Sequence, residues 1–336
     1  ETAMGQHGAA LKMSHLMIYD IFRYVAENLV LQAKGDAKNG NSAELNKKVV
    51  LFDEMTMGQL MAGFPDLIGI PYQLFAVFLV SEIDQLTCVP YIDAVESFGL
   101  PADCCPVPSS ECGALVLDAL PHMGKCFISS SMPCDGSTMA SSYMSRRFPD
   151  LPVFHLCFPV RYEDEETVQC AAEDIKACIK FIEEQTGAKW SWDAYFSAMK
   201  RFNTETSYEL EKWAVNQTAY PQIIGPCYEL FRKWNYEMDG GIDPRVLKTF
   251  KKVNKIMLKA YERKEEAWPG KMKYRAIVWS CPAHYYANFS NWLANCWGVN
   301  VLVEMESLNF TKQLETEDKE EALRDLGRLY ERMVMR

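Results

Sequence analysis

Short apolar runs alternate with helical periods along most of the chain. Continuous apolar runs of a few residues are typical of buried strands, and they lie at residues 49–52, 126–128, 153–157, 274–279 and 299–303. Between these runs, apolar residues recur every three to four positions, as in amphipathic helices. We expect such helices at residues 73–86, 89–98, 113–120, 137–147 and 284–295. Alternating strands and helices are typical of a parallel sheet with helices on both faces.

Other parts of the chain show helical periods without strands between them. Residues 11–33 predict an amphipathic helix, and the charged residues within it argue against a membrane span. Residues 34–46 are polar and rich in Gly and Asn, so we expect a linker there. In the middle third, helices are predicted at residues 165–185, 192–199, 208–215, 222–236 and 244–266, and a final helix at 318–335.

These patterns predict an α/β fold with two doubly wound parallel-sheet domains joined by a helical segment, preceded by an N-terminal helical arm. The expected parts are the arm and linker (1–47), a first α/β domain (48–164), a helical connector (165–270) and the start of a second α/β domain (271–336). Two strands, a helix between them and one further helix are too little for a doubly wound domain. We therefore expect the second domain to be incomplete in this chain.

Composition is that of an ordinary soluble protein. The 336 residues are 49% apolar and 24% charged, a length that favours two domains. The net charge of −10 argues against nucleic acid or an anionic membrane surface as the main partner. It leaves room for a small anionic ligand in a local basic pocket.

The cysteines predict a reducing compartment. Twelve cysteines in 336 residues are too few for a disulfide scaffold. Several lie in apolar periodic segments, as reduced core residues do: Cys157, Cys170, Cys178, Cys227 and Cys296. With no signal peptide visible at the start of the sequence, we expect a cytoplasmic protein.

Two cysteines stand out by their position. Cys105 follows a turn rich in proline, and Cys134 lies between Pro133 and Gly136, just beyond the predicted strand at 126–128. Ligands of parallel sheets bind outside the carboxyl ends of the strands, and two thiols brought together there suit a metal or an iron–sulfur cluster. Burial as small apolar side chains is the other interpretation, because the short CxxC spacing of a metal site is missing.

Three segments carry a resemblance to a known family. CPVPSSECG (105–113), SSSMPCDGS (129–137) and PVFHLCFPVRYEDEE (152–166) resemble, in order and spacing, the 2-hydroxyacyl-CoA dehydratase family, which also includes benzoyl-CoA reductase subunits. The resemblance covers most of the chain from about Lys48. It implies that Cys105 and Cys134 are two cysteine ligands of a [4Fe-4S] cluster. The family's third cysteine ligand lies in a later part and is assigned to no residue here.

The resemblance also implies an activity and partners. The chain is expected to be one subunit of a heterodimeric (R)-2-hydroxyacyl-CoA dehydratase, with a second homologous subunit as its partner. A separate ATP-hydrolysing iron–sulfur activator would deliver one electron, and the substrate would lose water through a ketyl radical to give an enoyl-CoA. One alternative is a subunit of an aromatic, benzoyl-type acyl-CoA reductase or a related ATP-dependent reductase. Another is a non-catalytic, cluster-bearing electron-relay subunit.

Other cysteines and histidines near these segments have competing interpretations. Cys104 could replace its neighbour as the ligand, whereas Cys112 and Cys126 are interpreted as packing residues. Two further residues invite a functional role but favour a structural one: Cys281, which by resemblance lies at the start of the second domain, and His284 beside it. His155, within an apolar strand, is expected to be a hydrogen-bonded core residue.

The proton-transferring base that the reaction requires is not assigned. Three acidic residues precede Cys105 and are candidates by position alone: Glu54, Glu82 and Glu96. Asp135 is expected to orient its loop through an Asx-type turn. The hydroxyls of residues 129–131 and 137–138 lie near an expected helix start, which could hold a thioester carbonyl or a CoA phosphate or simply cap the helix.

Overall fold

The structure is a computed structural model. It describes residues 8–39, 49–53, 58–74, 86–119, 124–131, 135–158, 164–224, 233–268, 272–278, 289–304 and 312–331. Within these residues, none of the helices combines the length and the apolar character that crossing a membrane requires.

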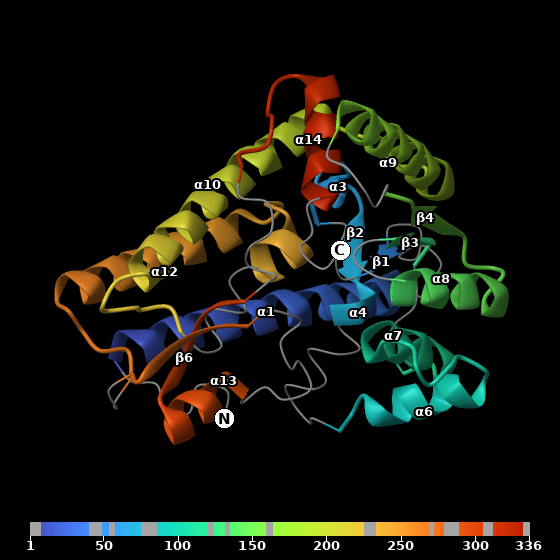
Figure 1. Ribbon diagram of the computed structural model, residues 1–336. Coiled ribbons are helices and arrows are strands. Elements are labelled where there is room, and N and C mark those ends of the chain that lie inside the picture. The colour runs from blue at the N-terminus through green and yellow to red at the C-terminus, as the bar shows by residue number, and fades with distance from the viewer. Residues whose placement is uncertain are drawn as a thin grey trace.

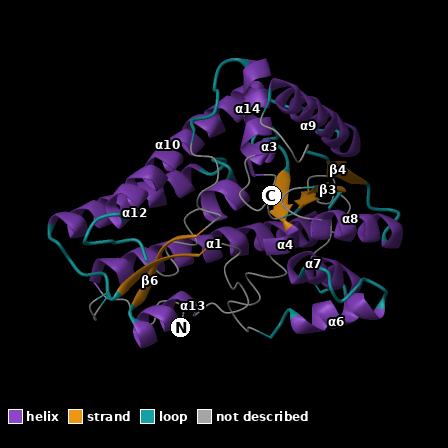
Figure 2. Ribbon diagram, viewed as in Figure 1, coloured by secondary structure: helices purple, strands orange, loops and turns teal. Residues whose placement is uncertain are grey.

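A four-stranded parallel sheet lies at the centre of the structure (Figure 2). Its strands are β1 (Val49–Phe52), β2 (Ile68–Pro71), β3 (Cys126–Ser130) and β4 (Val153–Leu156), in the order β2-β1-β3-β4. Three of them were predicted from their apolar runs, and the α/β fold class is confirmed. β2 was not predicted.

The register aligns the carboxyl ends of the inner strands. Phe52 of β1 pairs with Ile128 of β3, and Ser130 of β3 pairs with Leu156 of β4. Because all the strands are parallel, the segments that leave them in the carboxyl direction start at one edge of the sheet. That edge carries the Cys134 segment and is where the candidate site is expected.

The two faces of the sheet are covered by different helices, because successive side chains of a strand point to opposite faces (Figure 1). Val49, Leu51 and Phe127 face one core. That core is completed by α1 (Gly8–Asn39), α6 (Val89–Ser97), α7 (Pro106–Val116), α8 (Asp135–Arg147) and α12 (Pro244–Glu262). Val50, Phe52 and Ile128 face the other core. It is completed by α3 (Gly58–Met61), α9 (Glu165–Thr186), α10 (Trp192–Asn216) and α14 (Lys319–Glu331).

Several helices end where their sequence predicts. The helix α9 begins after Asp164, whose carboxylate accepts the Thr167 N–H at 2.8 Å. It ends at Gly187, which has a φ of +76°. The left-handed backbone is accessible to glycine without a Cβ penalty, and it terminates helices for that reason.

Three helices extend beyond their predicted bounds. The helix α1 continues to Asn39, into the expected linker, and α10 is continuous where two helices were predicted. The helix α7 begins at Pro106 instead of residue 113. Proline is favoured in the first turn because the helix does not use its missing N–H there. The prolines of this segment therefore start a helix and do not extend the turn.

The segment around residues 222–236 also differs from its predicted helix. Residues 221–224 are not helical, and a π-helix, η2 (Lys233–Asp239), follows after a part of the chain outside the described residues. The short helix α4 (Tyr72–Leu74) is the described start of the helix predicted at 73–86.

A second, two-stranded parallel sheet pairs β5 (Tyr274–Val278) with β6 (Val299–Glu304), as the two later apolar runs predict. Between them lie α13 (Phe289–Trp292) and the π-helix η3 (Leu293–Trp297). The last described helix, α14, does not stay with this sheet but packs on α9 beside the first one (Figure 1). The N-terminal arm α1 packs on α12. The domain boundaries themselves stay a prediction.

Candidate functional site

A buried aspartate ties two strands together at the carboxyl edge of the sheet. Asp53 directly follows β1, is 2% exposed and accepts the backbone N–H of Ser130 at 2.8 Å. The Asp53 N–H donates to the Ile128 carbonyl at 3.1 Å. Sequence reasoning singled out Glu54 and passed over this neighbour, although an aspartate directly after a buried strand is a recognisable signal. The two bonds fix the ends of β1 and β3 relative to each other.

Cys105 lies at the start of α7, with its side chain exposed. It is the residue before Pro106, and its carbonyl accepts the Ser109 N–H at 3.2 Å, which closes the first turn. The positive end of the helix dipole favours negative charge at such a position. The structure thus presents the Cys105 thiol to solvent at a helix N-terminus.

Cys134 lies outside the described residues, but both segments that flank it are described. β3 ends at Ser130, and α8 begins at Asp135, the residue next to Cys134. The strand end expected before Cys134 is therefore confirmed, whereas the position of the thiol stays a prediction.

The helices α7 and α8 pack against each other and begin at the same edge. α7 leads into β3 and α8 follows it, so both N-termini lie on the carboxyl side of the sheet. The helices meet where the Cys112 Sγ lies 3.7 Å from the Ala140 carbonyl oxygen. Cys105 and Asp135 precede this contact by seven and five residues, about 10 Å and 8 Å along each helix at 1.5 Å per residue. The contact joins the two helices that begin next to the predicted ligands.

The neighbouring cysteines are packing residues, as predicted. Cys112 and Cys126 are fully buried, and burial raises the pKa of Cys112 well above its ordinary value and that of Cys126 to about 12. Metal ligation needs the thiolate, which burial disfavours. Cys104 is partly buried and packs against the core around α7. Of the described cysteines in this segment, Cys105 is the one with an exposed thiol.

His155 is held by hydroxyl groups from β3 and α8. Its Nδ1 lies 3.2 Å from the Ser129 Oγ and 3.3 Å from the Ser141 Oγ, and its Nε2 lies 3.4 Å from the Thr138 Oγ1. Burial lowers the pKa of His155, with the Asp174 carboxylate acting in the opposite direction, so the ring is neutral at pH 7. The predicted hydrogen bonds of His155 are confirmed, but the residue is only partly buried and is not part of the core.

The hydroxyl-rich segment is used largely for internal contacts. The Ser131 Oγ accepts the Phe158 N–H at 2.9 Å, and the Ser131 N–H donates to the Leu156 carbonyl at 2.8 Å. These bonds join the ends of β3 and β4.

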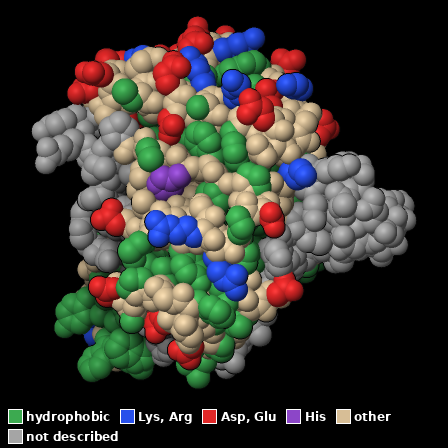
Figure 3. All heavy atoms as spheres, turned by 90° about the vertical axis from the view of Figure 1, so that its right-hand side faces the viewer, with side chains coloured by type: hydrophobic (Ala, Val, Ile, Leu, Met, Phe, Trp, Pro, Cys, Tyr) green, Lys and Arg blue, Asp and Glu red, His purple; other side chains and the backbone are tan. Residues whose placement is uncertain are grey.

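On the face that contains α8 and α9, hydrophobic and uncharged atoms cover most of the middle, whereas charged side chains gather at the top (Figure 3).

The sequence analysis did not identify a buried polar group on α7, the helix that begins after Cys105. Glu111, on α7, is 1% exposed, and its Oε2 accepts from the Gln73 Nε2 at 2.8 Å. Burial and the nearby Glu111 carboxylate raise the pKa of Tyr72, so this phenol stays protonated. α4, which directly follows β2, thereby contacts the middle of α7.

Cys157 was predicted to be a core residue, and the structure corrects this. It directly follows β4 and is exposed, and its N–H donates to the Asp174 Oδ2 at 2.7 Å. Partial burial and the Asp174 carboxylate raise the pKa of Cys157, which disfavours its thiolate. Cys170 and Cys296 are also exposed, because each lies on the solvent side of its helix, whereas Cys178 is buried as predicted.

The structure describes only two of the remaining candidates. Four of them lie outside the described residues: Glu54, Glu82, Cys281 and His284. Cys227 does too. Glu96 is exposed on α6, and Asp135 is exposed as the first residue of α8. Within the described part of the chain, no three His, Cys, Asp or Glu side chains are grouped to hold a metal ion. Among the described residues near this edge, two thiols are exposed: that of Cys105 before α7 and that of Cys157 after β4.

The comparisons with known proteins place the chain in a family. The family model described as 2-hydroxyglutaryl-CoA dehydratase, D-component, matches residues 86–336, which include α6, α7, the Cys105 and Cys134 segments and everything after them. None of the curated proteins matches the chain. The match covers far more than half of the sequence. The chain therefore belongs to the 2-hydroxyglutaryl-CoA dehydratase D-component family.

Proposed function

We propose that this chain is an iron–sulfur subunit of a 2-hydroxyacyl-CoA dehydratase, which removes water from an (R)-2-hydroxyacyl-CoA to give an enoyl-CoA. One observation carries the proposal. The exposed Cys105 starts α7 at the sheet edge where β3 and α8 flank Cys134, in a chain whose residues 86–336 match a dehydratase family.

The donor set around α7 fits an iron–sulfur cluster. Clusters are held by cysteine thiolates, and Cys105 is exposed at a helix N-terminus. Cys112 and Cys126 are excluded as ligands by burial and their raised pKa. We therefore propose that Cys105 and Cys134 would hold the cluster, with a third cysteine ligand that none of these residues supplies. A bound [4Fe-4S] cluster would supply Lewis acidity and one-electron transfer to the thioester.

The rest of the edge would position the substrate. His155 is neutral and is held by the hydroxyls of Ser129 and Thr138, so it adds no charge to the site. The first turn of α8 follows Cys134 directly, and backbone N–H groups at a helix start can hold an anionic oxygen of an acyl-CoA. Asp53 and Glu111 keep the strand ends and α7 in place.

The proposal includes two protein partners. A second homologous subunit would complete a heterodimer, and an ATP-hydrolysing iron–sulfur activator would deliver the priming electron. Both follow from the family resemblance of the segments at 105–113 and 129–137. We expect the complex to be cytoplasmic and sensitive to oxygen.

The test is an anaerobic assay of the complex purified from its native source, with the activator, ATP and a 2-hydroxyacyl-CoA. We expect enoyl-CoA to form in large excess over the electrons supplied, because a dehydratase returns the electron after each turnover. Consumption of electrons in proportion to product would instead indicate an acyl-CoA reductase. A chain that neither binds the acyl-CoA nor supports turnover would be a relay subunit, and the proposal would be wrong.

A further inference from the structure

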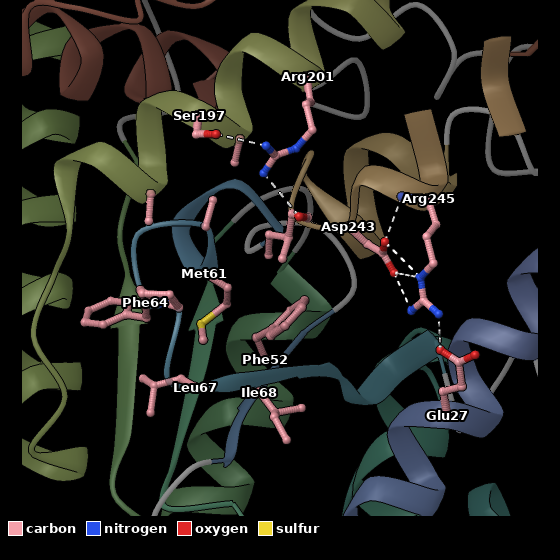
Figure 4. Close-up of a pocket in the computed structure, with 16 residues that line it drawn as sticks. Glu27, Phe52, Met61, Phe64, Leu67, Ile68, Ser197, Arg201, Asp243 and Arg245 are labelled. Carbon is pink, nitrogen blue, oxygen red and sulfur yellow. Dashed lines mark hydrogen bonds and ion pairs between the residues drawn. The ribbon is translucent and has the colours of Figure 1, made fainter. Parts of the chain in front are cut away.

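A cavity of about 420 Å³ lies at the β2 edge of the sheet, between the ends of β1 and β2 and the helices α3 and α10 (Figure 4). Its volume falls in the range of small-molecule sites. Buried or partly buried apolar side chains form its floor: Phe52, Met61, Phe64, Leu67 and Ile68. None of the residues proposed to hold the cluster lines it.

One guanidinium at the cavity contacts neutral oxygens. Arg201, on α10, donates from Nε to the Gly241 carbonyl at 2.7 Å and from Nη2 to the Ile242 carbonyl at 3.2 Å. Its Nη1 donates to the Ser197 Oγ at 2.9 Å (Figure 4). Among the described residues, no carboxylate oxygen forms an ion pair with it. These bonds use three of the five N–H donors of the guanidinium and fix its position.

The other charges around the cavity pair with one another. Arg245 donates to both carboxylate oxygens of Asp243, with its Nε at 3.0 and 2.8 Å. Its Nη1 lies 2.7 Å from the Glu27 Oε2. Glu27 also lies 4.0 Å from the Arg23 Nε. The lining carboxylates are thus engaged by other arginines, and Arg201 is the lining cation without such a partner.

Two buried carboxyl groups lie near Arg201, and burial disfavours the negative charge with which they could neutralise its guanidinium. Glu205, one turn further along α10, and Asp239, on η2, are each 0% exposed. Burial raises the pKa of Asp239 to about 7 and that of Glu205 well above its ordinary value. Burial therefore disfavours the charged form of both carboxyls, which limits their competition for the positive charge of Arg201 on the cavity wall.

We propose that this cavity binds a small carboxylate with a short apolar tail. The carboxylate would accept charge-assisted hydrogen bonds from the remaining N–H donors of Arg201. The tail would lie on the floor formed by Phe52, Met61 and Leu67. This site is separate from the proposed cluster ligands, and the proposal does not depend on the dehydratase activity.

The experiment is calorimetric titration of the full chain with hexanoate at about pH 6, which is below the pKa of about 7 of Asp239 and at which hexanoate is ionised. We expect a dissociation constant of about 1 mM or below. Hexanamide, which keeps the tail without the charge, and acetate, which keeps the charge without the tail, should each bind at least about tenfold more weakly.

Variants assign the binding to this cavity. Arg201→Gln should weaken hexanoate binding at least about tenfold, and Ala194→Leu, which fills the cavity from α10, should abolish it. Lys200→Gln is the matched control. It removes a positive charge from the residue directly before Arg201 on α10, and Lys200 is exposed and does not line the cavity. It should leave binding unchanged. The proposal is overturned if the unsubstituted chain does not bind hexanoate, or if Lys200→Gln weakens binding as much as Arg201→Gln does. If Arg201→Gln does not fold, the loss of binding in Ala194→Leu serves as the test.

Discussion

Replacing Lys212 with methionine should lower the free energy of unfolding by about 3–5 kcal/mol. The Lys212 Nζ lies 2.6 Å from the Glu209 Oε1, and the two side chains are 1% and 0% exposed. Without the ammonium group, the Glu209 carboxyl would lose its cation in a region that water does not reach. Breaking a buried ion pair on one side is costly because the remaining charge loses solvation and partner together.

The double variant Glu209→Gln/Lys212→Met separates this explanation from a simple loss of packing. It removes both charges, while the Trp213 Nε1, which donates to the Glu209 Oε1 at 3.0 Å, keeps an amide oxygen as acceptor. We expect the double variant to recover more than half of the loss. Denaturant unfolding measures both, with Lys252→Met, an exposed position on α12, as a control expected to change stability by less than about 0.5 kcal/mol. If the double variant lost as much stability as the two single substitutions added together, the ion pair between Glu209 and Lys212 would not stabilise the fold.

Replacing Gly113 with alanine should destabilise the fold by about 3 kcal/mol or more. A Cβ at this position would lie 1.8 Å from the Tyr91 carbonyl oxygen and 2.4 Å from its carbon. Both are backbone atoms of α6, so the two helices must separate. Alanine favours a helix interior over glycine by only about 1 kcal/mol, which does not offset the clash.

Gly99→Ala is the control substitution with which the stability loss of Gly113→Ala is compared. Gly99 has a φ of +103°, and no atom lies within 4 Å of its added Cβ, so the substitution costs backbone strain without a clash. We expect it to cost about 1–2 kcal/mol. Thermal or denaturant unfolding compares the two. A loss at Gly113 no larger than that at Gly99 would show that α6 and α7 do not pack as closely as described.

The central strands could be predicted because burial on both faces leaves an unbroken apolar run. β1 and β3 lie inside the sheet, and their residues are buried throughout. β2 is an edge strand of four residues with a glycine and a proline, so its sequence carries no such run. The end of α9 was predictable because Gly187 supplies a local signal that no tertiary contact overrides.

The buried charges of α10 could not be predicted from periodicity. Glu205, Glu209 and Lys212 occupy one face of the helix and would be interpreted as solvated. Their burial accompanies the packing of α10 against α12 and α3, which involves residues far away in the sequence. The continuous course of α10 was missed because the mostly polar residues 200–207, which include Glu205, interrupt the apolar pattern.

The candidate site was predictable in outline but not in detail. The position of Cys134 beyond a strand end followed from the apolar run before it, and the described end of β3 agrees with it. The exposure of Cys105 and Cys157 did not follow, because cysteine is usually buried and no local pattern marks an exposed one. The roles of Asp53 and Glu111 depend on pairing between segments that only the fold brings together.

The most direct test of the cluster site is the content of iron and acid-labile sulfide per chain in full-length protein purified without oxygen. We expect about four of each, as in a [4Fe-4S] cluster. The cluster should be lost in Cys105→Ala and in Cys134→Ala but retained in Cys112→Ala, whose thiol is fully buried. Protein without iron, or iron that survives both ligand substitutions, would contradict the assignment of Cys105 and Cys134.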